Sequence, residues 1–249
     1  MKTALVTGGV KRIGAAIAED LARNGYNLAL QYVSSVEEAE ELASRLKKHG
    51  IKIALFEKDL STTKACRSLF KFANQALGPV NLLINNASVF DTDEAIDFDD
   101  DTWDRHFALH LKAPSALAAE LAKQGEIENG LVVNMIDQRV WRLNPNFYSY
   151  TLSKSALWTA TQTMAQSLAP NIRVNAIGPG PTLQNERQAN DDFQKQIDGL
   201  LLQRGPELEE FGRTIRFLHE TRSITGQMIA LDGGQHLAWE TPDIAGIKE

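Results

Sequence analysis

The sequence predicts one α/β domain in which a mostly parallel, doubly wound sheet is covered by helices on both faces. Its 249 residues suit a single domain, since domains of this class often reach that length. Apolar residues make up 43% of the chain, which is enough to fill a core and excludes disorder as the main state. Short apolar runs alternate with longer amphipathic segments, which is the pattern of repeated strand–helix–strand units.

Seven apolar runs are expected to form the strands, because each is short and is bounded by turn residues. In order they are 3–7, 27–32, 51–56, 81–84, 130–136, 172–177 and 227–231. Helices are expected between them at 12–24, 36–49, 62–77, 101–123 and 148–168. The first three helices stop at Gly25, Gly50 and Gly78, because glycine readily adopts the backbone conformation that ends a helix. Parallel strands of this kind place a ligand at their carboxyl ends, near the reversal of strand order.

One segment, 181–206, breaks this alternation between the sixth and seventh expected strands. It is polar and rich in Gln and Asn. We interpret it as a helical flap over the site rather than as a second domain. The alternative is a solvated excursion without a role.

The overall composition limits the possible partners. The net charge of −6 argues against a nucleic-acid-binding surface, which would normally be basic. The single cysteine, Cys66, has no internal disulfide partner, which fits a reducing compartment. There is no run of 18 apolar residues, and the first expected strand begins at Thr3, which leaves no room for a cleavable signal. We therefore expect a cytoplasmic protein that binds neither nucleic acid nor membrane.

The first strand leads into a turn bracketed by Gly8 and Gly14. Small residues there let the backbone approach a pyrophosphate at the positive end of the next helix. Arg12 stands where such turns usually carry a middle glycine. The alternative is a glycine-rich turn that holds no ligand.

The end of the second strand distinguishes between the two nicotinamide dinucleotides. An NAD site commonly has an acid there, but Tyr32 is followed by Ser34 and Ser35, with Lys11 and Arg12 on the adjacent turn. Hydroxyl groups and cations suit a 2′-phosphate, so the sequence predicts NADPH rather than NADH. Alternatively, the two serines cap the helix that follows them.

Three other strand ends supply further candidate contacts. After the third strand, the Asp59 carboxylate is placed to accept the adenine amino group, with Leu60 beside it, or else to cap the helix expected at 62–77. After the fourth strand, Asn86, Ala87 and Ser88 leave space above the sheet and offer an amide to hold ribose and backbone. After the sixth strand, a turn is expected to pass along the nicotinamide; it contains Pro179, Gly180 and Thr182.

The candidate catalytic group is formed by Tyr150, Lys154 and Asp137. Tyr150 and Lys154 are four apart at the start of a long helix and so share a face. A nearby ammonium is expected to lower the phenol pKa, so that Tyr150 donates a proton as hydride arrives. Lys154 also suits the nicotinamide ribose. Asp137 ends the fifth strand, where it either orients a substrate nitrogen or relays a proton, or merely starts a turn.

Five segments together resemble the short-chain dehydrogenase/reductase family. They are Thr7–Gly14, Asn85–Ala87, the Tyr150/Lys154 pair, Asn175–Gly180 and Leu231–Gly234, in this order and spacing. The resemblance implies a Rossmann-type sheet of seven strands, hydride transfer with NAD(P) and usually a homotetramer. Two long helices, at 101–123 and 148–168, carry Ala and Leu on more than one face, as a helical interface would need, although both could simply cover the sheet.

A finer resemblance is to the pteridine reductase branch of that family. It rests on Arg12 in the glycine turn, on Asn85–Ser88 followed by Phe90, and on Asn134–Asp137, where the aspartate replaces the wider family's serine. It implies that Phe90 stacks a flat heteroaromatic ring against the nicotinamide and that Arg12 faces both cofactor phosphate and substrate. It also implies that Ser88 bonds substrate or cofactor, and that Asp137 and Tyr150 flank the reducible bond.

One position departs from the family. His110 stands where the family usually has an asparagine that helps hold the water linking the lysine to solvent. Either His110 substitutes for that asparagine or the relay differs. Trp141 and Arg142 either shape the pocket or belong to a surface loop.

The sequence therefore predicts an NADPH-dependent reductase acting on a pteridine-like nitrogen heterocycle. The alternatives are a carbonyl reductase, acting on a 3-oxoacyl thioester or a sugar-like ketone, and a cofactor-binding sensor without turnover. The expected cofactor contacts are Gly8, Lys11, Arg12, Ile13, Gly14, Tyr32, Ser34, Ser35, Asp59, Leu60, Asn86, Ala87, Ser88, His110, Tyr150, Lys154, Pro179, Gly180 and Thr182. The expected substrate contacts are Arg12, Ser88, Phe90, Asp137 and Tyr150, and no metal site is expected.

Overall fold

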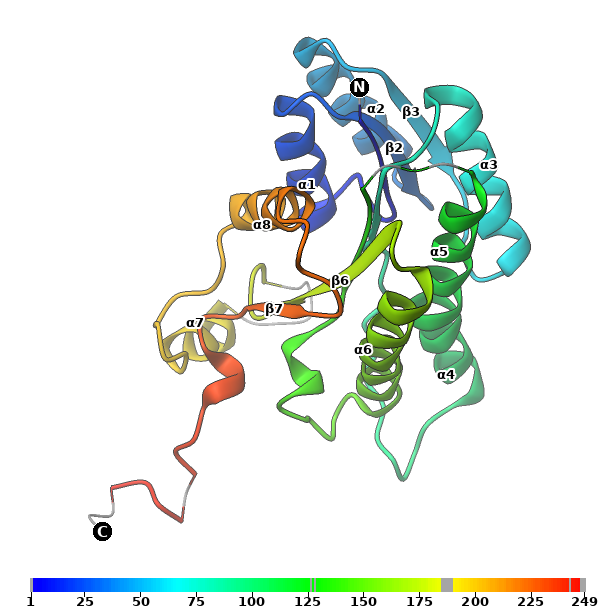
Figure 1. Ribbon diagram of the computed structural model, residues 1–249. Helices are drawn as coiled ribbons and strands as arrows, with labels where there is room; N and C mark the ends of the chain where they lie inside the picture. The colour runs from blue at the N-terminus through cyan, green and yellow to red at the C-terminus, as the bar shows by residue number, and fades with distance from the viewer. Residues whose placement is uncertain (1, 126, 128, 185–189, 242, 247–249) are drawn as a thin grey trace.

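A seven-stranded sheet lies between two layers of helices in the computed structural model (Figure 1). The structure describes residues 2–125, 127, 129–184, 190–241 and 243–246. The strands are β1 (Thr3–Val6), β2 (Asn27–Tyr32), β3 (Ile53–Glu57), β4 (Leu82–Asn85), β5 (Gly130–Met135), β6 (Ile172–Pro179) and β7 (Met228–Leu231). Their order is β3-β2-β1-β4-β5-β6-β7, and every neighbouring pair is parallel. The predicted fold class is confirmed.

The helices alternate with the strands as expected. They are α1 (Arg12–Arg23), α2 (Val36–Leu46), α3 (Thr63–Leu77), α4 (Asp100–Phe107), α5 (Ala113–Lys123), α6 (Tyr148–Leu168), α7 (Asn190–Asp198) and α8 (Leu208–Glu220). In the described part of the chain, four single turns complete the elements: η1 (Lys47–His49), η2 (Ala108–Lys112), η3 (Gln138–Val140) and η4 (Gln235–Leu237). Within the described residues, no helix combines the length and the apolar character needed to cross a membrane.

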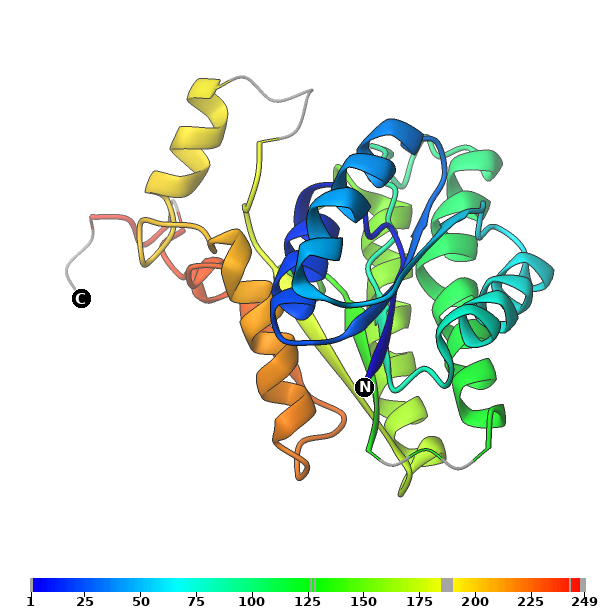
Figure 2. The same ribbon diagram turned by 90° about the horizontal axis from the view of Figure 1, so that it is seen from above.

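Each face of the sheet has its own apolar core. Helices α1, α2 and α8 cover one face, where Ile17 and Phe211 are fully buried. Helices α3, α5 and α6 cover the other, where Leu69 and Leu117 are fully buried (Figure 2). Because side chains alternate along a strand, Leu5 of β1 enters the second core while its neighbours enter the first. Burial on both faces explains why the strands are continuously apolar.

The strand order reverses between β1 and β4. The chain leaves β1 toward β2 and β3, then returns to place β4 on the other side of β1. The connections after β1 and β4 therefore diverge, leaving a crevice at the carboxyl ends of these two strands. The sequence analysis expected the ligand at this edge.

Two elements differ from the sequence-based expectation. The helix expected at 101–123 is interrupted by the π-helical turn η2 at Ala108–Lys112, so it forms α4 and α5. The helix α8 was not predicted at all. Its signals were present: Glu207 and Glu210 form a reciprocal capping box, and an amphipathic pattern follows. The predicted flap includes α7, which stands off the main sandwich in Figure 2, whereas residues 185–189 lie outside the described part.

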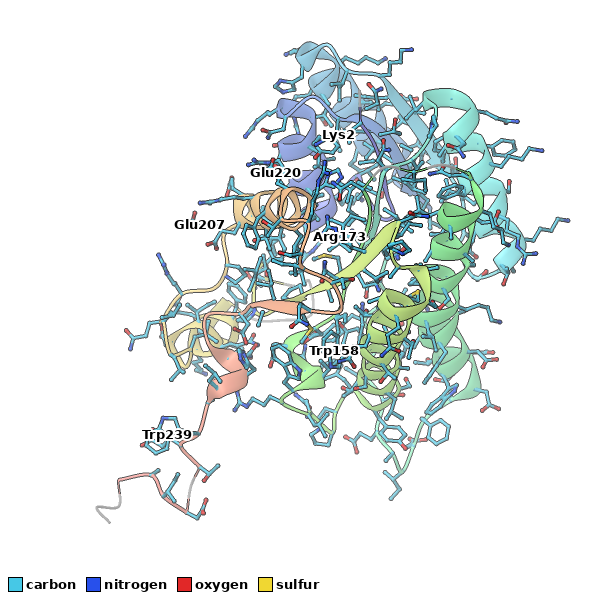
Figure 3. The ribbon with its side chains drawn as sticks, in the orientation of Figure 1. Lys2, Trp158, Arg173, Glu207, Glu220 and Trp239 are labelled. Carbon is cyan, nitrogen blue, oxygen red and sulfur yellow. The ribbon has the colours of Figure 1, made fainter. Side chains whose placement is uncertain are left out.

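The C-terminal end of α8 is capped by a buried arginine from β6. Arg173 is only 8% exposed, and Figure 3 shows it reaching from β6 toward that helix end. Its Nη1 donates to the carbonyl oxygens of Leu218, Thr221 and Ile224 at 2.7, 3.1 and 3.0 Å. Its Nη2 donates to the His219 carbonyl at 3.1 Å. One guanidinium thus satisfies carbonyls that the end of α8 leaves without helical partners.

Replacing Arg173 by methionine is therefore expected to lower the free energy of unfolding by about 2–4 kcal/mol, since several buried carbonyls lose their donor. Urea unfolding followed by circular dichroism measures this loss. Arg213→Met is the matched control, because Arg213 is exposed on α8, the helix that Arg173 caps. This variant should change the free energy of unfolding by less than about 0.5 kcal/mol. Equal losses in the two variants would contradict the capping role.

Candidate active site

The turn from β1 into α1 is built for close backbone contact. Gly8 has a φ of +58°, and a Cβ on Gly14 would lie 2.0 Å from the Gly8 carbonyl oxygen, so any side chain at Gly14 would displace the turn. Arg12 has a φ of +51°, in the left-handed region that glycine normally occupies. The arginine thus keeps the backbone conformation of the usual middle glycine while adding a cation at the first residue of α1.

The end of β4 locks onto this turn. The Asn86 side-chain nitrogen donates to the carbonyl oxygens of Thr7 and Gly8, each at 3.0 Å. The backbone nitrogens of Asn86 and Ala87 donate to the Thr7 hydroxyl at 2.9 and 3.0 Å. The Asn86 amide therefore holds the backbone at the crevice, as the sequence analysis expected of an amide at this strand end.

A cavity of about 470 Å³ opens at this edge of the sheet. The predicted positions that line it are Arg12, Ile13, Asn86, Ser88, Phe90, Asp137, Tyr150, Lys154, Pro179, Gly180 and Thr182. It is also lined by residues that the sequence analysis did not select: Met135, Ile136, Arg139, Pro181, Leu183, Phe193, Gln196 and Gln235. Trp141 and Arg142 are not among the described lining residues and are exposed, as expected for a surface loop.

Asp137 and Tyr150 are directly hydrogen-bonded inside the cavity. The Tyr150 hydroxyl donates to Asp137 Oδ2 at 3.0 Å, and both residues are buried. Asp137 also caps η3, because its Oδ1 accepts from the Arg139 backbone nitrogen at 2.8 Å. The aspartate is therefore both a local turn residue and a partner of the phenol, and its role toward a substrate stays a prediction.

The expected lowering of the Tyr150 pKa is not found. Burial and the Asp137 carboxylate raise the pKa of the Tyr150 phenol well above its usual value. Lys154 is itself buried, which lowers the pKa of its ammonium to about 8. Its Nζ donates to the Met135 carbonyl oxygen at 2.8 Å and lies 5.7 Å from the centre of the Tyr150 ring. The phenol is thus held in its protonated form, which suits a proton donor.

Phe90 forms an aromatic wall next to the acid pair. Its ring stacks on Phe147 with centroids 4.4 Å apart and an interplanar angle of 13°. The Tyr150 ring meets Phe90 edge-on, with centroids 4.7 Å apart. This packing fixes the position of Phe90 relative to the proton donor.

His110 lies behind the cavity rather than in its lining, in the π-helical turn η2. Its Nε2 accepts from the Val89 backbone nitrogen at 3.2 Å and lies 2.9 Å from the Ser88 hydroxyl. Its Nδ1, which must then carry the proton, lies 2.9 Å from the Ser153 hydroxyl. Burial lowers the pKa of His110 well below its usual value. The neutral imidazole joins the end of β4 to α6.

Three residues predicted to contact the adenosine end of the cofactor, Ser35, Lys11 and Asp59, do not line the cavity. Ser35 occupies the N-cap position of α2, but its side chain makes no capping bond, so its hydroxyl is not used by the helix. Lys11 pairs with Glu38 at 2.6 Å. Asp59 bonds Ser61, and the cap of α3 is Thr62, so the alternative role of Asp59 as that cap is wrong. These cofactor contacts stay predictions.

The remaining adenosine-side positions lie outside the cavity, and their cofactor contacts also stay predictions. Leu60 has its side chain in the core, and Tyr32 and Ser34 do not line the cavity. Arg12 reaches across the crevice: its guanidinium donates to the carbonyl oxygens of Leu183 and Gln184, both at 3.1 Å. Arg12, which the sequence analysis expects to face the cofactor phosphate, thus binds backbone carbonyls near the start of the flap in this structure.

Known proteins share this architecture over nearly the whole chain. A family profile described as Enoyl-(Acyl carrier protein) reductase matches residues 9–236. The 3-oxoacyl-(acyl-carrier-protein) reductase FabG of Staphylococcus epidermidis is 28% identical over 242 residues, covering 95% of this chain and 99% of its own. This chain is a member of the short-chain dehydrogenase/reductase family. It is therefore an oxidoreductase.

Two solved structures within this family are much more similar to the chain. FolM Alternative dihydrofolate reductase 1 from Brucella canis, complexed with NADP, is 56% identical, with a TM-score of 0.92 and coverage of 98% of each chain. The corresponding protein from Brucella suis, also in complex with NADP, is 57% identical, with a TM-score of 0.94 and coverage of 97% of this chain and 98% of its own.

The ionisation of Lys154 predicts an alkaline limit to turnover by this oxidoreductase. Because the pKa of Lys154 is lowered to about 8, its cation is present at neutral pH and is lost as the pH rises through that value. We expect kcat/KM, which reports the free enzyme, to fall above about pH 8. A profile of kcat/KM from pH 5 to about pH 10 checks this. A flat profile across that range would show that turnover does not need the ammonium.

Proposed function

We propose that this protein is an NADPH-dependent reductase whose substrate is a pteridine-like nitrogen heterocycle. The observation that carries the proposal is the hydrogen bond from Tyr150 to Asp137, beside Phe90, in one cavity. The FolM proteins from Brucella, named as alternative dihydrofolate reductases, support the substrate class.

The residues around the cavity fit a phosphorylated dinucleotide. The cavity extends from Arg12 and Ile13, at the start of α1, to Tyr150 and Lys154. The start of a helix and an arginine both favour phosphate, and no acid stands at the end of β2 to receive an unmodified ribose diol. The two FolM structures contain NADP, which supports the choice of the phosphorylated form.

When bound, NADPH supplies the hydride, and the protein supplies the proton and the orientation. Tyr150 is the proton donor, because burial keeps its phenol protonated and its hydroxyl lies in the cavity. Lys154 provides a positive charge 5.7 Å from the centre of the Tyr150 ring, whose phenol becomes negative when the proton leaves. The Tyr150 hydroxyl has one proton and donates it to Asp137 in this structure, so in the proposed reaction that proton turns to the substrate while Asp137 accepts a substrate N–H in its place.

The carboxylate is what favours a heterocycle over a ketone. A ketone oxygen needs hydrogen-bond donors, but an ionised carboxylate only accepts. A pteridine presents N–H groups that a carboxylate can accept, and its flat ring suits stacking on Phe90. Carbonyl reduction remains the second candidate because of the similarity to FabG, which is named as a 3-oxoacyl reductase.

The proposed assembly is a homotetramer in the cytoplasm. Its support is the family resemblance and the apolar residues left on the surface, such as Leu152 of α6 at 36% exposure. Trp239 is 67% exposed on the C-terminal segment, away from the sandwich (Figure 3).

Light scattering of the purified protein is expected to give a mass four times the 27.5 kDa of one chain, since burying these surfaces is favourable. A mass of one chain at micromolar concentration would contradict the proposed assembly.

Steady-state kinetics test the proposed reaction. With NADPH, kcat/KM for dihydrobiopterin or dihydrofolate is expected to exceed that for a panel of ketones and 3-oxoacyl thioesters by at least tenfold. Tyr150→Phe is expected to lower kcat by about 10²–10⁴-fold, because it removes the proton donor.

Tyr148→Phe is the matched control, because Tyr148 lies two residues away, packs on Phe98 and Trp103, and does not line the cavity. A wild-type preference for the ketones would assign the second candidate function. Full activity of Tyr150→Phe on the pteridines would refute the proposed proton donor.

A further inference from the structure

Arg139 is a cavity residue that neither the sequence motifs nor the proposed reaction accounts for. It follows Asp137 by two positions in η3 and lines the same cavity. The side chains of Arg139 and Asp137 are only 18% and 12% exposed, so this ion pair is largely shielded from water. A shielded pair with good geometry holds its partners firmly, whereas an exposed pair contributes little.

Arg139 grips both oxygens of the Asp137 carboxylate. Its backbone nitrogen donates to Oδ1 at 2.8 Å, and its Nη1 donates to Oδ2 at 3.0 Å. The same Oδ2 accepts from the Tyr150 hydroxyl at 3.0 Å. Rotation of the carboxylate would break at least one of these contacts. The direction in which Tyr150 points its hydroxyl therefore depends on the Arg139 side chain.

The guanidinium is held in place by the aromatic wall. Its central carbon lies 5.1 Å from the centre of the Phe90 ring and 4.9 Å from that of Phe147. These nearly equal distances mean that it bridges the two stacked rings. A guanidinium is planar and weakly hydrated, so it packs on aromatic rings and forms directed hydrogen bonds at once. A lysine ammonium at this position could supply charge but not that geometry.

We propose that Arg139 is a positioning residue that couples the Asp137–Tyr150 pair to the Phe90–Phe147 wall. One side chain then fixes the proton donor relative to the ring on which the substrate stacks. This inference rests on the proposed function, in which Tyr150 delivers the proton and Phe90 stacks the substrate. A misplacement of the donor by about 1 Å can cost about 10²-fold in rate, so the coupling has a measurable consequence.

The charge of Arg139 acts in the same direction as its geometry. Burial and Asp137 raise the pKa of Tyr150, and the Arg139 cation opposes that increase. A phenol whose pKa is raised without opposition would hold its proton more tightly and transfer it less readily. Arg139 thus supports proton delivery both by orientation and by charge, without itself contacting the proton.

The test is a series of variants at Arg139 assayed with NADPH and dihydrobiopterin. Arg139→Met keeps the length of the side chain but removes the charge and the planar group, and we expect kcat to fall by about 10–10²-fold. Arg139→Lys keeps the positive charge but lacks the planar guanidinium, so its kcat should recover only part of the loss seen in Arg139→Met. The NADPH dissociation constant, measured by fluorescence titration, should stay within twofold of wild type in both variants.

Arg142→Met is the matched control, because Arg142 is an exposed arginine three residues along the same loop. Its kcat should stay within twofold of wild type. Circular dichroism and the melting temperature establish that each variant is folded. If Arg139→Met unfolds, Arg139→Lys carries the test, and wild-type kcat in that variant overturns the proposal.

A double variant separates positioning from an independent contribution. If Arg139 acts through Asp137, then adding Arg139→Met to Asp137→Asn should lower kcat by less than threefold more than Asp137→Asn alone. If the fold loss of kcat in the double variant equals the product of the two single losses, the residues act separately and the proposal is overturned. A parallel loss of NADPH affinity in Arg139→Met also overturns it, because Arg139 would then be a cofactor ligand.

The proposed function and this inference can fail separately. If the wild-type enzyme reduces only a ketone or a 3-oxoacyl thioester, the pteridine assignment fails. The same variants are then compared on that substrate, because the geometry of Asp137 and Tyr150 is required for proton delivery in either reaction. Loss of kcat in Arg139→Met on that substrate would keep the positioning role, and its absence would overturn it.

Discussion

The hydrogen bond from Tyr150 to Asp137 is the interaction on which the site depends. It joins the first turn of α6 to the carboxyl end of β5, two elements that meet only because the sheet places β5 beside α6. Its strength comes from burial, since a carboxylate and a phenol in water would each bond solvent instead. Lys154, Arg139 and Phe90 all contact one member of this pair.

Burial also decides which groups are charged. A cationic Lys154 beside a Tyr suggests a phenol with a lowered pKa, but in the folded chain desolvation and Asp137 act more strongly and raise it. The same desolvation lowers the pKa of Lys154 to about 8 and keeps His110 neutral. The site therefore combines a protonated phenol with an ammonium whose pKa is lowered to about 8, so both groups carry a proton at neutral pH.

The neutral state of His110 gives the departure from the family pattern a physical meaning. An asparagine side chain offers one acceptor and one donor, and a neutral imidazole offers the same pair at its two nitrogens. His110 uses them to join the backbone of Val89 to the hydroxyl of Ser153. The interruption of the long helix at η2 lies at this same residue. His110 therefore forms a link between the segment after β4 and α6.

The sequence by itself determined the layered fold, the order of most elements and the residues at the strand ends, because hydrophobic period, glycine stops and motif spacing are local properties. It missed α8, whose pattern was overlooked, and the π-turn η2, which interrupts an otherwise regular helical pattern. Only the tertiary structure decided that Arg139 grips Asp137, that Arg12 reaches Leu183, and that the phenol pKa rises. Those outcomes depend on which side chains distant elements bring together and on how much water the packing removes, and neither is encoded in any single segment.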